Sequence, residues 1–547
     1  MPGVTAVDPI AELASALQAA ASELTPDKPV PPAKLERPPK PEFGDYSSNA
    51  PMLLAPVLGE PPRAVAERLG ATVLERLGAA VDRVEVAGPG FLNLFMAETW
   101  FRETLAEAAA AGDAYGSSKP DLRERVLVEF VSANPTGPLT VASARGAAYG
   151  DSLARILELG GHDVEREYYV NDQGTQVRLF GESIKARAQG TEPPEDGYRG
   201  EYVAELADQI PGAAGADPDE LARRAVELML ERIRATLIRF RVSMDRFFAE
   251  RALHESGAVE KAIELLEEHG AVYQSEGALW LRTTTYGDDK DRVLRRSNGE
   301  YTYFASDIAY HGHKRERGIE RLIDVWGADH HGYIGRMTAA WQALGGDPSQ
   351  FEMLIMQLIH LMEGGQRARM SKRAGVIETL EDLIDDIGVD AARWFLLQRS
   401  HDTTIDLDLS LAREQSQDNP VYYVQYAHAR IASILRNAGE ERVRDALAAD
   451  LVAGSGDLHP SELGLLKRLL EFPEEVRTAA LRRAPHRLAA YAHDVAQQFS
   501  AFYRDCHVLG AAEEGGDEDF RLVLSTQAKR VIARSLDLLG VEAPESM

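Results

Sequence analysis

The residues that could carry out chemistry first gather in the segment EFVSANPTGP, residues 129–138. The mostly apolar run Val126–Val131 predicts a buried parallel strand, and a helix rich in small residues is predicted to begin near Thr140. A strand, a tight turn and a helix form the first crossover of a nucleotide-binding sheet, and the helix N-terminus presents N–H groups to a phosphate. We therefore expect this loop to bind phosphate.

Glu129 lies inside this apolar strand. A buried carboxylate needs a partner, and a guanidinium group suits it because the two can form paired hydrogen bonds. A ligand-binding carboxylate and an internal ion pair are both consistent with the sequence at this point.

A second candidate segment is GGQRARMSKRAG, residues 364–375, which carries four basic side chains between glycines. Such a loop can close over a polyphosphate and stabilise charge on a leaving group. A basic surface loop is the alternative, and the Met-Ser-Lys core between the glycines favours the functional interpretation.

The elements that must position these segments suggest three regions, which we place at residues 1–112, 120–390 and 391–547. The first begins with a helix over 8–24 and a proline-rich stretch over 25–42, and continues as a small α+β domain. The second alternates strands and helices, as a parallel sheet requires, with an insertion at about 185–245. The third is almost entirely helical, and Asn419-Pro420 is predicted to start one of its helices.

Composition restricts the functional classes. The chain has 547 residues and a net charge of −27, which by itself argues against nucleic-acid binding unless the basic residues cluster. Candidate clusters occupy residues 232–241, 367–373 and 477–487, with solvated helix faces as the alternative. A single cysteine, Cys506, excludes a disulfide framework and favours a cytoplasmic protein, and no apolar run approaches the roughly 20 residues that cross a bilayer.

Several further motifs share the order and spacing of a known family. They are FGDYSSN, VAGPGFLNLF, YVNDQGTQ, FAER, GALW, GDDK, YTYFASDIAY, WGADHHGY, DAARWFLLQRSHD and DNPVYYVQYAHARI. Together with the two loops, they make the chain resemble a bacterial-type arginyl-tRNA synthetase, a class I aminoacyl-tRNA synthetase, over almost its whole length. The resemblance implies a multidomain α/β protein: a Rossmann-like catalytic domain with an insertion, a small N-terminal α+β domain and an all-α anticodon-binding domain.

The resemblance also implies the substrates L-arginine, ATP with Mg²⁺, and tRNA(Arg), without a structural metal. Carboxylates suit the arginine guanidinium, which is planar and permanently charged. The residues that match arginine-binding positions are Glu129, Ser132, Asn134, Asp172, Gln176, Glu250, Tyr303 and Asp307. Asp172 and Gln176 are predicted to share one helix face, since they are four residues apart.

The ATP-binding and catalytic positions fall mainly in the two loops. By resemblance, the ATP-binding residues are Asn134, Pro135, Thr136, Gly137, Thr140, Ser143, Asp329, His330, Met370 and Lys372. The catalytic residues are Thr140, Ser143, Arg369, Ser371 and Lys372.

The sequence departs from the family in its first signature. The usual run is ANPTGPLH-x-GH, whereas this chain has Thr140, Ala142 and Ser143 in place of histidine, glycine and histidine. Hydroxyl groups can donate hydrogen bonds but carry no positive charge, and the loss of one stabilising donor typically costs about 10²–10³ in rate. In the second signature Arg369 replaces the usual first lysine, and Lys372 is retained.

These departures leave alternatives to a working synthetase. One is a synthetase-like protein that binds arginine or tRNA without forming an adenylate, and a weaker one is a ligase that uses another acceptor. For tRNA binding we predict stacking of bases on Tyr422, Tyr426 and Arg430, with packing of these side chains against a neighbouring helix as the alternative. A monomer and tRNA-dependent activation of arginine are family expectations.

Overall fold

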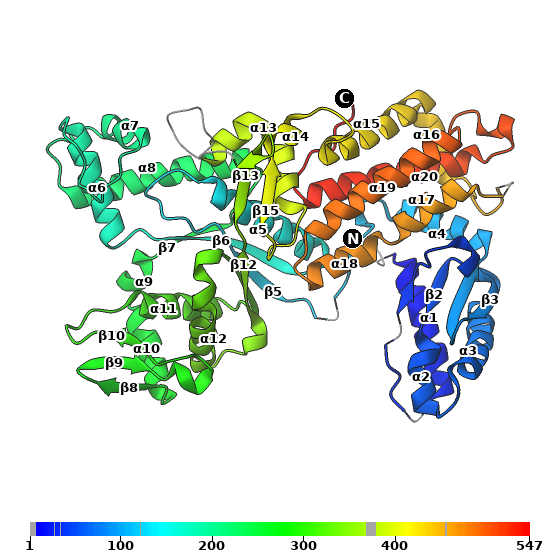
Figure 1. Cartoon of the computed structure of the whole chain (residues 1–547), viewed down its shortest axis with the longest axis horizontal. Helices are drawn as coiled ribbons and strands as arrows, with labels where there is room; N and C mark the ends of the chain where they lie inside the picture. Colours follow the sequence, from blue (N-terminus) through cyan, green and yellow to red (C-terminus); the bar gives the residue numbers. More distant parts are fainter. Residues whose placement is uncertain (1–6, 27, 33, 121, 368–378, 455–456) are drawn as a thin grey trace.

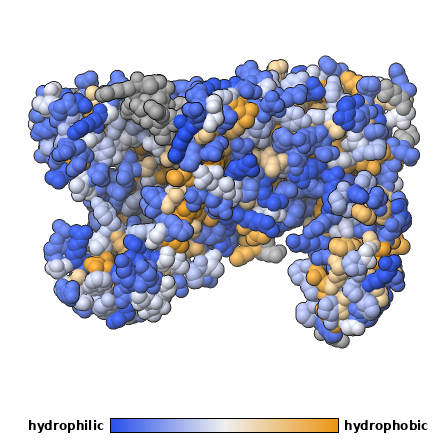
Figure 2. Space-filling model, in the orientation of Figure 1, coloured by the Kyte–Doolittle hydropathy of each residue, from blue (hydrophilic) through white to orange (hydrophobic). Residues whose placement is uncertain are grey.

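The computed structural model describes residues 7–26, 28–32, 34–120, 122–367, 379–454 and 457–547. Figure 1 shows a small N-terminal unit, a central region built on a parallel sheet, and a long array of C-terminal helices that lies between them and above. The face in Figure 2 is mainly hydrophilic, in keeping with the high net charge. Within the described residues, no helix is long and apolar enough to cross a membrane.

The N-terminal unit is an antiparallel four-stranded sheet with strand order β1-β2-β4-β3, covered by helices. Its elements are α1 (Pro9–Leu24), β1 (Leu35–Glu36), β2 (Tyr46–Ser48), α2 (Ala50–Leu58), α3 (Pro62–Leu77), β3 (Val81–Ala87), β4 (Phe91–Met96) and α4 (Glu98–Ala111). The predicted first helix and the predicted mixture of helices and strands in this unit are confirmed.

The central region is organised around a five-stranded parallel sheet with strand order β12-β11-β5-β6-β7. The strands are β5 (Arg125–Glu129), β6 (Asp163–Val170), β7 (Arg246–Ala249), β11 (Arg321–Gly327) and β12 (Phe351–Met356). In β5, Val126 and Val128 pack into one hydrophobic core and Leu127 into another. Both faces of the strand are therefore buried, which explains why its sequence is continuously apolar.

Helices cover both faces of this sheet. On the side of Val126 and Val128 lies α5 (Val141–Leu159), and on the side of Leu127 lie α10 (Ala258–Glu268), α11 (Tyr303–Glu316) and α12 (Ile334–Ala343). The predicted crossover of strand, loop and helix is confirmed, with α5 starting immediately after Thr140. The predicted end of the strand was wrong: it stops at Glu129, because Val131 and Ser132 have positive φ angles of 68° and 40°.

Two insertions interrupt the parallel sheet. The predicted one, between β6 and β7, contains α6 (Thr175–Ala188), α7 (Glu201–Gln209) and α8 (Pro218–Arg239). The other follows β7 and was not predicted: α9 (Arg251–Glu255) and α10 lead into an antiparallel sheet of β8 (Val272–Ser275), β9 (Ala278–Leu281) and β10 (Arg292–Arg295). Glu276 and Gly277, both with positive φ, form the tight turn between β8 and β9.

A second small sheet joins the central region to the helices. Strand β13 (Ile359–Glu363) pairs with β14 (Gln366–Arg367) and, in parallel, with β15 (Ile405–Asp408). Helix α13 (Leu380–Leu397) lies between them in sequence. The prediction of a nearly all-helical chain after residue 390 therefore missed β15.

The C-terminal region is an array of helices: α14 (Leu409–Arg413), α15 (Pro420–Ala438), α16 (Glu440–Ala448), α17 (Pro460–Leu470), α18 (Phe472–Leu481), α19 (His486–Asp505) and α20 (Glu518–Leu538). Asn419 caps α15, as predicted: its side chain accepts a hydrogen bond from the Val421 N–H.

The N-terminal unit is bound directly to these helices. The buried Arg102 of α4 pairs with Asp517 at 2.7 Å. The Tyr115 hydroxyl donates to the Leu469 carbonyl, and Arg477 pairs with Asp8. The first and last parts of the chain thus share one packed interface.

Candidate active site and nucleic-acid-binding surface

The loop after β5 turns sharply at its two left-handed residues. There the Ser132 hydroxyl donates to the Glu129 carboxylate at 2.9 Å and accepts a hydrogen bond from the Tyr169 N–H at 3.1 Å. Further along, the Tyr168 hydroxyl donates to the Ala133 carbonyl. These bonds attach the loop to β6, so that Asn134 is exposed at the carboxyl edge of the sheet, where such sheets bind ligands. Pro135 and Thr136 are buried behind it, and Gly137 is half-buried.

Thr140 is the N-cap residue of α5, and its hydroxyl lies 3.5 Å from the Ser143 hydroxyl. Thr140 is exposed and Ser143 half-buried, so two hydroxyls lie beside the N–H groups of the first helical turn. These groups can donate hydrogen bonds to an anion, and the helix dipole favours negative charge there.

The predicted basic loop lies outside the described residues from 368 to 378, so no position is described for Arg369, Met370, Ser371 and Lys372. Its two flanks are described. Arg367 ends the β13–β14 hairpin, and Thr379 forms an isolated β-bridge with Thr140. The Leu380 N–H also donates to the Leu139 carbonyl at 2.9 Å. The loop therefore returns directly beside the start of α5.

An acidic site is formed by Glu250, which follows β7, and Asp307, which lies on α11. The Asp307 carboxylate accepts a hydrogen bond from the Tyr333 hydroxyl at 2.5 Å, and Glu250 lies 3.9 Å from His254. Within the described residues, neither carboxylate forms an ion pair with a lysine or an arginine.

Burial, followed by the repulsion of Asp307 and Asp172, raises the pKa of Glu250 to about 7. Burial also raises the pKa of Asp307. Raised pKa values in buried acids indicate negative charge that no internal cation compensates, so the site favours a cationic ligand.

Asp172 does not share a helix face with Gln176, and that prediction was wrong. Asp172 lies in the loop before α6, where it accepts a hydrogen bond from the Arg251 N–H and pairs with the Arg251 guanidinium at 3.1 Å. Gln176 is exposed in the first turn of α6 and accepts a hydrogen bond from the Tyr198 hydroxyl.

Glu129 forms an internal ion pair, one of the two arrangements that the sequence allowed. Its carboxylate is 2.6 Å from the ammonium group of Lys314, which is fully buried. The partner is thus a lysine of this chain rather than a guanidinium.

The remaining predicted positions lie at the rim of the sheet. Tyr303 begins α11 and is 63% exposed. Asp329 and His330 are exposed in the 3₁₀ helix η5 (Ala328–Tyr333) that follows β11, with 3.1 Å between their polar atoms. The sequence pattern did not single out Tyr169, Tyr333 or Lys314. For Lys314, the available signal in the sequence is its position as a lysine on the apolar side of α11.

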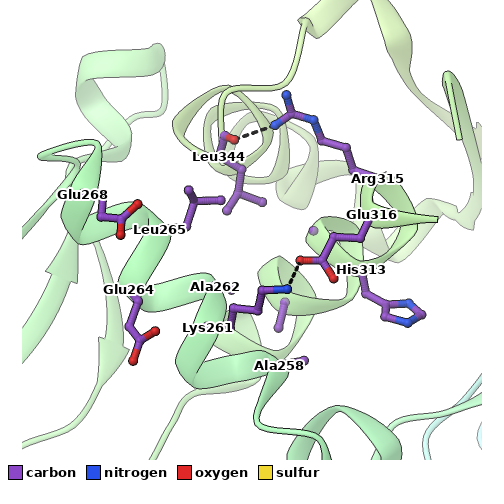
Figure 3. A pocket seen from close by; sticks show the side chains of 12 residues that line it. Ala258, Lys261, Ala262, Glu264, Leu265, Glu268, His313, Arg315, Glu316 and Leu344 are labelled. Atoms are coloured by element: carbon purple, nitrogen blue, oxygen red, sulfur yellow. Dashed lines mark hydrogen bonds and ion pairs between the residues drawn. The ribbon is translucent and has the colours of Figure 1, made fainter. Parts of the chain in front are cut away.

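The described residues contain no group of three or more histidine, cysteine or acidic side chains arranged to hold a metal ion. A hollow of about 580 Å³ lies between α10 and α11, spanned by the ion pair of Lys261 and Glu316 (Figure 3). It shares no lining residue with the acidic site, because it uses a different side of α11.

On the C-terminal helices, Tyr422 and Tyr426 stack with ring centroids 6.3 Å apart and an interplanar angle of 8°. The Arg430 guanidinium lies over the rings of Tyr426 and of Tyr503, which belongs to α19 and is 41% exposed. The predicted residues therefore form one stack along α15, extended by a tyrosine that the sequence pattern did not identify.

The candidate basic clusters are largely neutralised where they are described. Arg232 and Arg239 pair with Glu381 and Asp385 of α13, and Arg483 pairs with Glu352 of β12. These arginines join elements to one another, so the clusters at 232–241 and 477–487 give no free basic patch.

Comparison with known proteins agrees with this geometry. Three family models match: the arginyl-tRNA synthetase N-terminal domain at residues 11–96, the catalytic domain of class I tRNA synthetases (R) at 105–194 and 203–427, and the DALR anticodon-binding domain at 424–547.

Curated relatives and solved structures match along the chain. The chain is 44% identical over 540 residues to an arginine–tRNA ligase of Shouchella clausii, with 96% of each chain covered. It is 45% identical over 531 residues to that of Nitratidesulfovibrio vulgaris, which covers 94% of this chain and 96% of the relative. The crystal structure of Thermus thermophilus arginyl-tRNA synthetase matches with a TM-score of 0.77 and 26% identity, covering 98% of this chain and all of the other. The chain belongs to the arginyl-tRNA synthetase family.

Proposed function

We propose that this protein activates L-arginine with ATP at the carboxyl edge of the parallel sheet and transfers the arginyl group to the 3′ end of tRNA(Arg). The observation that carries the proposal is the pair formed by the buried Glu250 and the half-buried Asp307, two carboxylates without an internal lysine or arginine partner among the described residues. A guanidinium group would supply the missing charge and offers five donors to the two acids.

The reaction has two steps. The arginine carboxylate attacks the α-phosphorus of ATP, the bond to the β-phosphate oxygen breaks, and pyrophosphate leaves. A terminal ribose hydroxyl of the tRNA then attacks the activated carbonyl and AMP leaves. Both steps depend mainly on positioning and on stabilisation of charge, because the protein forms no covalent intermediate in them.

Arginine would lie between the acidic site and the loop after β5. Its guanidinium would contact Glu250 and Asp307, with Tyr303 at the rim, and its α-amino and carboxylate end would face Asn134 and Ser132. Asp172 and Gln176 would lie near the entrance. Glu129 would contribute through the position that it gives to Ser132, since its carboxylate is already paired with Lys314.

The triphosphate would lie at the start of α5. Thr140, Ser143 and the N–H groups of the first turn would bind phosphate oxygens in place of the two histidines of the family signature. Arg369 and Lys372 would supply positive charge, and Ser371 a hydroxyl donor, from the loop that returns at Thr379. Asn134 to Gly137, Asp329, His330 and Met370 would line the nucleotide.

Mg²⁺ would enter with ATP, because it usually binds through substrate phosphates and one or two carboxylates. The described residues offer no protein cage for the ion, so we assign no protein ligand to it. Bound in this way, it would neutralise charge on the departing pyrophosphate.

The tRNA would bind to the helical region and reach the site with its 3′ end. Unpaired bases can stack on Tyr422, Tyr426 and Arg430, since each offers a flat surface. A requirement for tRNA in arginine activation, a cytoplasmic location and a monomeric state are parts of the same proposal.

Arginine-dependent ATP–pyrophosphate exchange, measured with and without tRNA, tests the proposal. We expect exchange, lost in Asp307→Asn and retained in Asp385→Asn, which removes only an exposed partner of Arg239. Arginine binding without exchange under either condition would identify an arginine-binding protein instead. Exchange without transfer to tRNA would identify a ligase with another acceptor.

A further inference from the structure

We propose that Lys314 and His311 are positioning residues for the arginine site. They link the two sides of the site through one buried chain of hydrogen bonds and thereby fix the distance between Asp307 and Ser132. The inference rests on the proposed function of that site, and it assigns to both residues a role in the affinity for arginine without contact with the substrate.

The chain of hydrogen bonds begins on α11. The Asp307 carbonyl lies 2.7 Å from Nδ1 of His311, and Nε2 of His311 lies 2.7 Å from the Asp324 carboxylate on β11. The other oxygen of Asp324 accepts from the Lys314 ammonium at 2.9 Å. Three residues of α11 and one residue of β11 are thus joined.

The chain then crosses to β5 and β6. Lys314 also donates to Glu129 at 2.6 Å, and the second oxygen of Glu129 accepts from the Ser132 hydroxyl. That hydroxyl accepts from the Tyr169 N–H, and the Tyr169 ring lies 4.5 Å from the ring of Tyr310 on α11. The links therefore run from one wall of the site to the other without entering it.

The charged groups in this chain are buried together. Glu129, His311, Lys314 and Asp324 are all at most 5% exposed. The Lys314 ammonium group lies between the Glu129 and Asp324 carboxylates, at 2.6 Å and 2.9 Å. The two ring nitrogens of His311 face the Asp307 carbonyl and the Asp324 carboxylate. The ammonium group therefore holds the two acids together.

The pKa values of Lys314 and Asp324 agree with this arrangement. Burial alone would lower the pKa of Lys314, but Asp324 and Glu129 outweigh it and raise that pKa above its ordinary value. Burial opposes ionisation of Asp324, but Lys314 and His311 hold its pKa at about 2.

Loss of Lys314 would leave two buried carboxylates without the ammonium group between them. Two ionised carboxylates repel each other and are stabilised by hydration, so α11 would move relative to β5. Because Asp307 lies on α11 and Ser132 follows β5, this movement would separate the two ends of the arginine site. The ATP segment at the start of α5 is attached elsewhere, through Leu139 and Thr379.

The experiment compares Lys314→Met and His311→Gln with a control immediately after the same helix, Arg317→Met. Arg317 also pairs with the sheet, at 2.6 Å from the buried Glu167. Glu167 accepts a hydrogen bond from the Tyr310 hydroxyl, but among the described residues this pair makes no bond to the four buried residues at the centre of the chain. For each variant, KM for arginine, KM for ATP and kcat are measured by pyrophosphate exchange in the presence of tRNA. Calorimetric titration with L-arginine gives the affinity directly.

We expect KM for arginine to rise by about tenfold to a hundredfold in both test variants, the range that displaced binding groups produce, while KM for ATP changes by less than about twofold. Arg317→Met should leave KM for arginine and KM for ATP unchanged. If both test variants fold and bind arginine as the wild type does, or if their KM for ATP rises equally, the proposal is refuted. If Lys314→Met does not fold, the result for His311→Gln decides the test. Absence of exchange in the wild type would instead refute the proposed function.

Discussion

Replacement of Glu250 by glutamine should make the ligand-free protein more stable at pH 8 and remove most of its affinity for arginine. The reason is the cost of an ionised, buried carboxylate beside Asp307 and Asp172. Its pKa rises from 4.5 to about 7, and each pH unit of such a change corresponds to about 1.4 kcal/mol. The folded protein therefore loses at most about 3.5 kcal/mol to this group when it is fully ionised.

The direction of the pH dependence follows from proton binding. Between pH 4.5 and about 7 the folded state holds a proton on Glu250 that the unfolded state has released. The destabilisation of the folded state by Glu250 is therefore absent below pH 4.5, grows through this interval and is complete above about pH 7. Glu250→Gln should raise the urea midpoint at pH 8 and change it little at pH 4.5.

Arginine binding should show the complementary dependence. The guanidinium stays charged throughout, so ionisation of Glu250 controls the attraction. We expect the dissociation constant measured by calorimetry to be about tenfold larger at pH 6 than on the plateau above pH 7, with proton release on binding at pH 6.

A buried carboxylate that has a cationic partner provides the matched control. Asp151 is paired with Arg393 at 2.6 Å and with Arg155 at 2.9 Å. Asp151→Asn should lower the urea midpoint at pH 8, opposite in sign to Glu250→Gln, because it leaves a buried guanidinium uncompensated. Equal effects of Glu250→Gln at pH 8 and pH 4.5, or unchanged arginine affinity, would refute the reasoning.

Three other changes have defined outcomes. Replacing Thr140 and Ser143 together by alanine should lower kcat for exchange by about 10²–10³ with little change in KM for arginine; an unchanged kcat would assign phosphate stabilisation to other groups. Tyr426→Ala should raise KM for tRNA, because a stacked base is worth about 1–3 kcal/mol, and should leave calorimetric arginine affinity unchanged. Arg393→Met should destabilise the protein by about 3–5 kcal/mol in urea unfolding, since it leaves Asp151 buried with less positive charge; a smaller loss would show that Arg155 suffices.

Local pattern was a good guide to the elements of the central sheet and to the helices. The apolar run of β5 and the Asn-Pro start of α15 could be recognised because neighbouring residues determine them. The end of β5 could not, since the positive φ angles of Val131 and Ser132 depend on bonds to β6. The β8–β9 hairpin turns at Glu276-Gly277, a feature that a regular alternation of strands and helices does not predict.

For the site, sequence identified the acids but not their partners. Glu129 and Lys314 are separated by 185 residues, and Asp172 and Arg251 by 79. Glu129 and Asp172 each meet a cation of their own chain, whereas Glu250 meets no lysine or arginine among the described residues. Which of these occurs depends on how strands far apart in sequence are ordered in the sheet. The departure at Thr140 to Ser143, in contrast, was visible only by comparison of sequences.

The attachment of Arg102 to Asp517 also constrains the order in which the protein can mature on the ribosome. The two residues are 415 positions apart. At the usual 5–20 residues per second, Arg102 emerges roughly 20–80 s before its partner is synthesised. During that interval the surface of α4 that will be buried stays in water, and Arg102 lacks the Asp517 carboxylate. The N-terminal unit can therefore complete its packing only after α20 has been synthesised. A chain truncated before α20 should expose α4 to proteases and chaperones.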